Sequence, residues 1–284
     1  MSALSDFKKT KEFLVCVDSD GCAMDTMNIK HNCCFGPCMV DEWKLQNFSS
    51  LILPRWNDIN LYTITRGINR FKGLLTALTE INDQYTEIED LDSLKMWVDT
   101  SCELSNSALE RAIAEKPDSV CLKKALNWSN AVNVAIRLLP EEKIKPFDGV
   151  KKALEYAHIQ ADIAVVSSAN HDAVLNEWEK HGLLPNTDVV LTQNAGRKAY
   201  CISELLKKGY SPEKVLMCGD ALGDMQAAEE NGVLYFPILV RLEKECWEEF
   251  VNYGFEKLVS NEYAGEYAEK RKYAFLKNLG ENDG

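Results

Sequence analysis

Two acidic residues, Asp18 and Asp20, follow an apolar run near the start of the chain. The run over residues 13–17 is Phe-Leu-Val-Cys-Val, and Asp-Ser-Asp-Gly comes next, a pattern typical of a buried parallel strand that ends in a turn. The carboxyl ends of such strands hold ligands in open α/β sheets, so both carboxylates can turn into one crevice. A divalent cation would relieve their repulsion, and carboxylate oxygens suit Mg²⁺. The same tetrapeptide also occurs in ordinary turns.

More polar residues stand at the ends of later apolar runs. These residues are Ser167, Ser168, Lys198, Asp220 and Asp224. Parallel strands end at the same edge of a sheet, so acids for a metal, a hydroxyl and an ammonium can converge there and form a phosphate site. Each residue alone has a simpler interpretation. Ser167 can be a helix cap, Lys198 a surface charge, and Asp224 a first-turn acid favoured by the helix dipole.

The second half of the chain alternates between predicted strands and predicted helices. The strands are expected over residues 163–166, 189–191, 215–218 and 233–236, and the helices over 151–159, 171–181, 197–208 and 224–230. Strands that alternate with helices of this length indicate right-handed β-α-β units and a parallel sheet. With the run at 13–17, the sheet has five predicted strands.

A long segment between the first strand and the others has only helical patterns. One apolar helix face is expected from Ile64, Ile68, Phe71, Leu75 and Leu78. A later helix, over about 122–139, has Asp118 as its candidate N-cap. We therefore predict an α/β core made of residues 1–21 and 146–240, interrupted by a helical insert over 22–145. Residues 241–284 are expected to form a helical extension whose aromatic side chains pack on the core.

The composition restricts the kinds of partner. The formal net charge of −12 argues against nucleic-acid binding, which usually needs a basic surface. No stretch of about 18 apolar residues occurs, so no membrane partner is expected. The first residues lack the apolar centre of a signal peptide, and we expect a cytoplasmic protein.

Taken in order, these segments resemble the motifs of the haloacid dehalogenase-like (HAD) superfamily of hydrolases. The first motif, Asp-x-Asp-Gly after a strand, is similar to residues 18–21, and the fourth, Gly-Asp-x-x-x-Asp, to residues 219–224. Ser167 resembles the second motif. Lys198 is the best match to the third, and Arg197 and Lys207 are the alternatives for this basic residue. Residues 146–150 resemble the segment that re-enters the family's core. The resemblance implies a Rossmann-like parallel-sheet core with an inserted all-helical cap domain.

The resemblance also implies roles for the candidate residues. Asp18 would be the nucleophile that forms an aspartyl-phosphate, and Asp20 would act as general acid and then general base. The metal, Mg²⁺, would be held by Asp18, the backbone carbonyl of Asp20, and Asp220, while Asp224 would orient a metal-bound water or support Asp220. Phosphoryl oxygens would be bound by Ser167, Ser168 and Lys198.

These roles imply a magnesium-dependent phosphatase that acts on a small phosphorylated metabolite. Family dehalogenases typically lack the second acid, so Asp20 favours phosphate ester hydrolysis or phosphoryl transfer. A phosphomutase keeps the same acids and is one alternative. A phosphate-binding module without turnover is another, and the substrate and the oligomeric state are left open.

Overall fold

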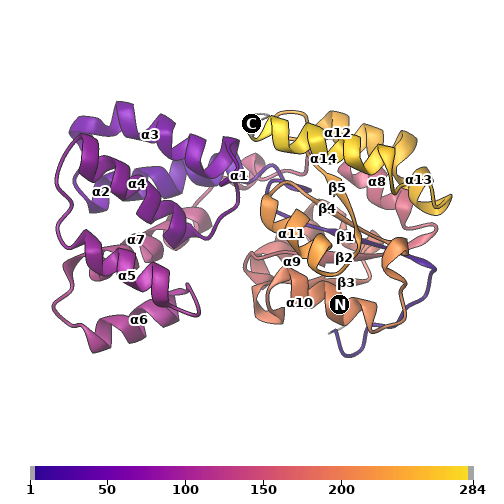
Figure 1. The fold of residues 1–284 in the computed structure, drawn as a ribbon, viewed down its shortest axis with the longest axis horizontal. Coiled ribbons are helices and arrows are strands. Elements are labelled where there is room, and N and C mark those ends of the chain that lie inside the picture. Colours follow the sequence, from indigo (N-terminus) through magenta and orange to yellow (C-terminus); the bar gives the residue numbers. More distant parts are fainter. Residues whose placement is uncertain (1–3, 281–284) are drawn as a thin grey trace. The chain divides into compact units, whose positions relative to one another are not determined.

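The computed structural model describes residues 4–280, which divide into two compact units (Figure 1). The first unit contains the chain up to Met27 and from Ile144 onward, and the second contains Asn28–Lys143. Assignment of these units to a catalytic core and a cap stays a prediction. No helix among the described residues combines the length and apolarity needed to cross a membrane.

A five-stranded parallel sheet forms the centre of the first unit, which confirms the predicted α/β fold. The strands are β1 (Phe13–Val17), β2 (Ala161–Val166), β3 (Val189–Leu191), β4 (Val215–Gly219) and β5 (Leu234–Pro237). Their spatial order is β3-β2-β1-β4-β5. Along the chain, β2 and β3 are added on one side of β1, and β4 and β5 are added on its other side. The point where this order reverses, the switch point, therefore lies between β1 and β4. Ligands bind at such a point in open α/β sheets.

Helices of the first unit cover the sheet. They are α8 (Val150–Ala157), α9 (His171–Lys180), α10 (Lys198–Leu206), α11 (Leu222–Glu230), α12 (Glu243–Glu249), α13 (Phe255–Val259) and α14 (Glu266–Asn278). Apolar side chains of α10 and α11 share one core cluster with Leu14 and Cys16 of β1. These β1 positions are two residues apart, as a strand requires for side chains on one face.

The C-terminal helix α14 packs beside the edge strand β5 (Figure 1). Arg271 of α14 donates to the Pro237 carbonyl at 2.8 Å and pairs with Glu249 at 2.5 Å. Its guanidinium also lies over the Phe236 ring, 4.7 Å from the centroid. A covered edge strand is protected from pairing with another chain.

The second unit, residues 28–143, is described in full and contains helices joined by turns and loops, with no β-strand. Its helices are α2 (Gly36–Glu42), α3 (Ser49–Asn57), α4 (Arg70–Gln84), α5 (Leu91–Thr100), α6 (Asn106–Glu115) and α7 (Val120–Arg137), and the short α1 (Met27–Lys30) precedes them. The helix predicted from Ile64 begins only at Arg70, because the Asn69 side chain caps it by accepting from Phe71 N–H. The predicted cap Asp118 is also wrong, since Ser119 accepts from Leu122 N–H and begins α7.

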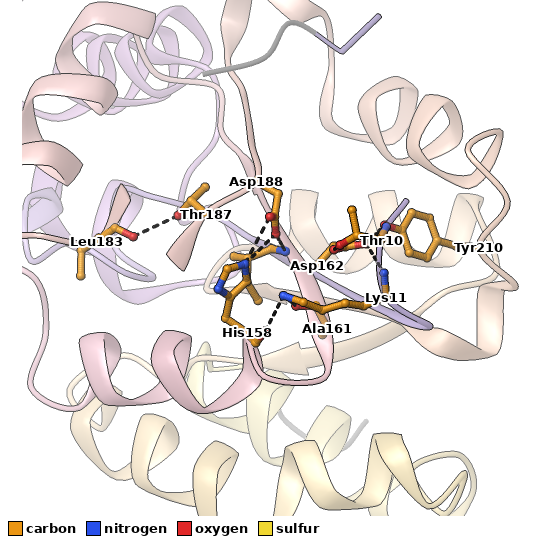
Figure 2. A network of polar contacts seen from close by, with 10 residues as sticks. Thr10, Lys11, His158, Ala161, Asp162, Leu183, Thr187, Asp188 and Tyr210 are labelled. Atoms are coloured by element: carbon orange, nitrogen blue, oxygen red, sulfur yellow. Dashed lines mark hydrogen bonds and ion pairs between the residues drawn. The ribbon is translucent and has the colours of Figure 1, made fainter. Parts of the chain in front are cut away.

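The buried Asp162 carboxylate accepts hydrogen bonds from residues near the start of the chain (Figure 2). Asp162 lies near the amino end of β2, whereas the predicted site lies at the carboxyl ends of the strands. Asp162, the second residue of β2, is fully buried. It accepts backbone N–H bonds from Thr10 at 2.9 Å and Lys11 at 3.0 Å, and hydroxyl bonds from Thr10 at 2.5 Å and from Tyr210. Burial alone would raise the pKa of Asp162, but these hydrogen bonds outweigh it and lower that pKa.

We expect Asp162→Asn to lower the free energy of unfolding by about 2 kcal/mol at pH 7, because hydrogen bonds to a charged group are lost. A depressed pKa stabilises the fold above the unfolded value of about 4, and this contribution disappears as pH falls below it. The difference between wild type and variant should therefore shrink in acid, as measured by urea unfolding at several pH values. The exposed Asp118 provides a control, since Asp118→Asn should change stability little at any pH.

Candidate functional site

Three buried carboxylates meet at the switch point of the sheet. Asp18 directly follows β1 and Asp220 directly follows β4, while Asp224 lies in the first turn of α11. Each contributes one oxygen atom, and these three atoms lie within 4.8 Å of one another. Relative exposures are only 6% for Asp18, 2% for Asp220 and 0% for Asp224. The structure therefore brings together three of the predicted acids.

Lys198 is the cation beside these acids. It is the first residue of α10, and its Nζ lies 2.9 Å from Asp18 Oδ1 and 2.5 Å from Asp224 Oδ1. Its side chain is 14% exposed. When all three carboxylates are ionised, three negative charges gather in this buried cluster beside the Lys198 ammonium. Uncompensated buried charge is strongly unfavourable, so the cluster favours binding of a divalent cation.

Burial and the neighbouring charges together shift the pKa values of the side chains in this cluster. Burial raises the pKa of Asp18 to about 6, although the Lys198 ammonium opposes the shift. Burial also raises the pKa of Asp224, with Lys198 opposing and Asp220 adding to the rise. Burial alone would lower the pKa of Lys198, but Asp18 and Asp224 outweigh it and raise that pKa above its ordinary value. Lys198 is therefore charged at neutral pH.

The donor chemistry of this cluster fits Mg²⁺. All three side chains offer carboxylate oxygen, the ligand type that Mg²⁺ prefers, and their oxygens are close enough to share one ion. The Asp20 carboxylate is not part of this group and instead accepts the Thr26 hydroxyl at 2.6 Å. Asp20 could still contribute its backbone carbonyl, as predicted.

The serines predicted to bind phosphate follow β2. Ser167 is 3% exposed and its N–H donates to the Leu191 carbonyl at 2.9 Å, which continues the pairing with β3. Its Oγ accepts the Ala169 N–H at 3.2 Å, while Ser168 is exposed. Since Ser167 and Asp18 directly follow neighbouring parallel strands, both lie at one sheet edge.

Gly219 holds the turn that carries Asp220 and Asp224. Its carbonyl accepts the Tyr235 hydroxyl and the Ile238 N–H, each at 2.8 Å. A Cβ atom on Gly219 would lie 2.3 Å from Asp224 Cγ and 2.5 Å from its Oδ2. The Asp224 carboxylate thus occupies the space that any other residue would need for its side chain.

We expect Gly219→Ala to displace the Asp224 carboxylate and to weaken Mg²⁺ binding and activity by about 10–100-fold, the range seen when groups that orient metal ligands are changed. Isothermal titration with Mg²⁺ and phosphate release would measure both effects. Gly223→Ala is the matched control, because a Cβ there meets nothing within 4 Å. Equal losses in both variants would contradict this role of Gly219.

Two residues that contact the candidate site have no sequence pattern that predicts a role there. Thr26 donates to the Asp20 carboxylate and Tyr235 donates to the Gly219 carbonyl. Neither residue stands in a charge pattern or at a strand end that would distinguish it from packing residues. Only the tertiary structure reveals these hydrogen bonds.

Comparisons with known proteins find a family model that is similar to part of the chain. Residues 103–237 match the family model described as haloacid dehalogenase-like hydrolase. This range contains Ser167, Lys198, Asp220 and Asp224, and it excludes Asp18 and Asp20. No curated protein matched the sequence.

Solved structures are similar to this chain at low sequence identity. A candidate phosphoglycolate phosphatase of Lactobacillus delbrueckii subsp. bulgaricus has 16% identity and a TM-score of 0.50, over 94% of this chain and 99% of the other. A candidate beta-phosphoglucomutase of Thermotoga maritima has 17% identity and a TM-score of 0.45, over 86% and 99%. The chain is therefore similar to haloacid dehalogenase-like hydrolases over residues 103–237, and it shares its fold with the first of these structures.

Proposed function

We propose that this protein is a magnesium-dependent phosphatase that cleaves a small phosphorylated metabolite through an aspartyl-phosphate on Asp18. The observation that supports this most is the position of Asp18. Its buried carboxylate lies 2.9 Å from the Lys198 ammonium and shares a cluster with Asp220 and Asp224. A nucleophilic carboxylate, a cation for phosphoryl oxygens and acids for a metal are the parts this reaction needs.

Magnesium would be held by the carboxylates of Asp18 and Asp220 and by the backbone carbonyl of Asp20. Asp224 would support these ligands, since it accepts both Lys198 and the Ala221 N–H. When bound, the ion would offset the negative charge of the carboxylates and stabilise charge on the transferring phosphoryl group.

The proposed reaction uses Asp18 and Asp20 in two steps. A carboxylate oxygen of Asp18 attacks phosphorus in line with the leaving oxygen, the P–O ester bond breaks, and Asp20 gives its proton to that oxygen. Asp20 then takes a proton from a water molecule that attacks the aspartyl-phosphate, which releases phosphate and restores Asp18. The bond from the Thr26 hydroxyl would orient Asp20 between the steps.

Phosphoryl oxygens would be bound by the hydroxyls of Ser167 and Ser168 and by the Lys198 ammonium. Lys198 is fixed between two carboxylates, so its position is set before substrate arrives. Pre-positioned charge of this kind stabilises a transition state without reorganisation at the moment of reaction.

Phosphate release from p-nitrophenyl phosphate, with Mg²⁺ and with EDTA, tests the proposal. We expect turnover only with Mg²⁺, and a panel of small phosphate esters would then identify the substrate class. Conversion of a sugar phosphate to its isomer without phosphate release would replace the proposal by a phosphomutase. Phosphate binding without turnover on any ester would indicate a binding module. A cytoplasmic location stays a prediction from the sequence.

A further inference from the structure

The loop that carries Asp18 and Asp20, residues 18–24, is held by bonds within itself. The Ser19 carbonyl accepts N–H bonds from Ala23 at 3.0 Å and Met24 at 2.8 Å. Gly21 has a φ of 83°, which favours glycine, and its N–H donates to the Met24 carbonyl at 2.9 Å. These bonds shape the turn. Its two ends are joined to the rest of the first unit by backbone bonds, from Asp18 N–H to the Cys218 carbonyl and from Phe147 N–H to the Ala23 carbonyl, each at 3.0 Å.

Two tryptophans from distant parts of the sequence bond to this loop. The Trp178 indole of α9 donates to Ser19 Oγ at 2.9 Å, and the Trp247 indole of α12 donates to the Cys22 carbonyl at 3.0 Å. Both tryptophans are 0% exposed, as are Ser19 and Cys22. The bonds are therefore shielded from water, and a hydrogen bond in such a buried place is electrostatically stronger than one in water.

A buried tryptophan of this chain does not always have a hydrogen-bond partner for its indole N–H. In the second unit, the buried indole nitrogens of Trp43 and Trp56 have no hydrogen-bond partner among the described residues. The two bonded indoles of the first unit, by contrast, meet on one short loop, at positions 19 and 22 on either side of Asp20. Core packing would need only the aromatic rings, whereas the N–H bonds add a defined direction.

We propose that the indole N–H groups of Trp178 and Trp247 are positioning groups for catalysis, which fix residues 18–24 so that the Asp18 and Asp20 carboxylates keep their reactive geometry. Ser19 is covalently linked to both acids, so movement of Ser19 moves each of them. A misplacement of about 1 Å can lower a rate by about 100-fold. The inference rests on the proposed phosphatase function.

The proposal gives Trp247 a role that its place in the sequence does not suggest. It lies beyond β5, in the segment expected only to pack on the core. Through it, α12 contributes directly to the position of the loop after β1. The C-terminal part of the chain would then be needed for turnover as well as for stability.

The test replaces each indole by a ring that lacks the N–H group. Trp178→Phe and Trp247→Phe are expected to lower kcat for p-nitrophenyl phosphate by about 10–100-fold, with KM changed less than about threefold. Trp128→Phe is the matched control, because Trp128 is also 0% exposed and its indole donates to the Phe35 carbonyl at 3.1 Å in the second unit. The control should lower the melting temperature to a similar extent while kcat stays within about twofold.

A double-mutant cycle separates the hydrogen bond from the loss of ring volume. Ser19→Ala removes the acceptor of the Trp178 bond, so Ser19→Ala combined with Trp178→Phe should lower kcat little more than either change alone. Losses that multiply would show that the two side chains act separately, and would overturn the role of this bond.

Hydrogen exchange measured by mass spectrometry provides a readout that needs no activity. Peptides covering residues 18–24 should exchange faster in Trp178→Phe and Trp247→Phe than in wild type or Trp128→Phe. Unchanged exchange, or a kcat loss equal to that of the control, would overturn the proposal. If the wild-type protein releases no phosphate from any ester, the phosphatase assignment fails, and the positioning role for catalysis fails with it. Exchange data would then report only whether the indoles fix the loop.

Discussion

Asp18→Asn is expected to lower phosphate release by about 10⁴-fold or more, since removal of a covalent nucleophile leaves only the residual effect of binding. The asparagine keeps the size of the side chain but cannot form an aspartyl-phosphate. Steady-state release of phosphate at saturating Mg²⁺ measures the loss. Residual activity within about tenfold of wild type would show that another residue attacks phosphorus.

The same variant should be more stable than wild type when Mg²⁺ is absent. Burial raises the pKa of Asp18 to about 6, from an unfolded value of about 4. Its contribution to stability is thus complete below about pH 4 and lost as pH rises to about 6. In EDTA at pH 7, Asp18→Asn should therefore melt above wild type, and Mg²⁺ should raise the melting temperature of wild type more than that of the variant.

Lys198→Met should reduce activity by about 10³-fold and destabilise the metal-free protein by about 3–5 kcal/mol. The first effect follows from loss of the cation for phosphoryl oxygens, and the second from leaving Asp18 and Asp224 buried without their partner. Mg²⁺ should restore part of the stability, because it supplies positive charge to the same carboxylates. Urea unfolding with EDTA measures the loss of stability, and urea unfolding with Mg²⁺ measures how much stability the ion restores. Phosphate release measures the loss of activity.

Lys207 offers a matched control near the end of the same helix. Its Nζ pairs with Glu204 at 2.5 Å, and its side chain is 69% exposed. Lys207→Met should therefore keep the activity and change stability by about 0.5 kcal/mol or less. If Lys207→Met lost activity and Lys198→Met did not, the assignment of the phosphate-binding lysine would be wrong.

The strands and the acids after them could be predicted because local rules determine both. An apolar run that ends at Asp18 or Asp220 indicates a buried strand, and parallel strands end at one edge. Helix starts were less predictable. Asn69 and Ser119 begin α4 and α7 through side-chain bonds that neighbouring polar residues could equally have formed.

Partners that meet only through tertiary packing could not be predicted. The contact of Lys198 with Asp224 depends on how α10 lies against α11, and no spacing in the sequence encodes it. The bonds from Trp178 and Trp247 to the loop after β1 are of the same kind. Aromatic residues in such positions indicate burial, but the direction of an indole N–H is visible only in the folded chain.

The position of β1 in the sheet affects how the protein folds during synthesis. Strand β1 pairs with β2 and β4, and Leu14 lies in register with Asp162 and with Val215. A ribosome must therefore translate all of residues 28–143 before either partner strand of β1 emerges. The helical residues of that segment have local contacts and can fold first, while the apolar β1 segment stays exposed on the nascent chain. Chaperones that bind short apolar segments are expected to act on this protein early in translation.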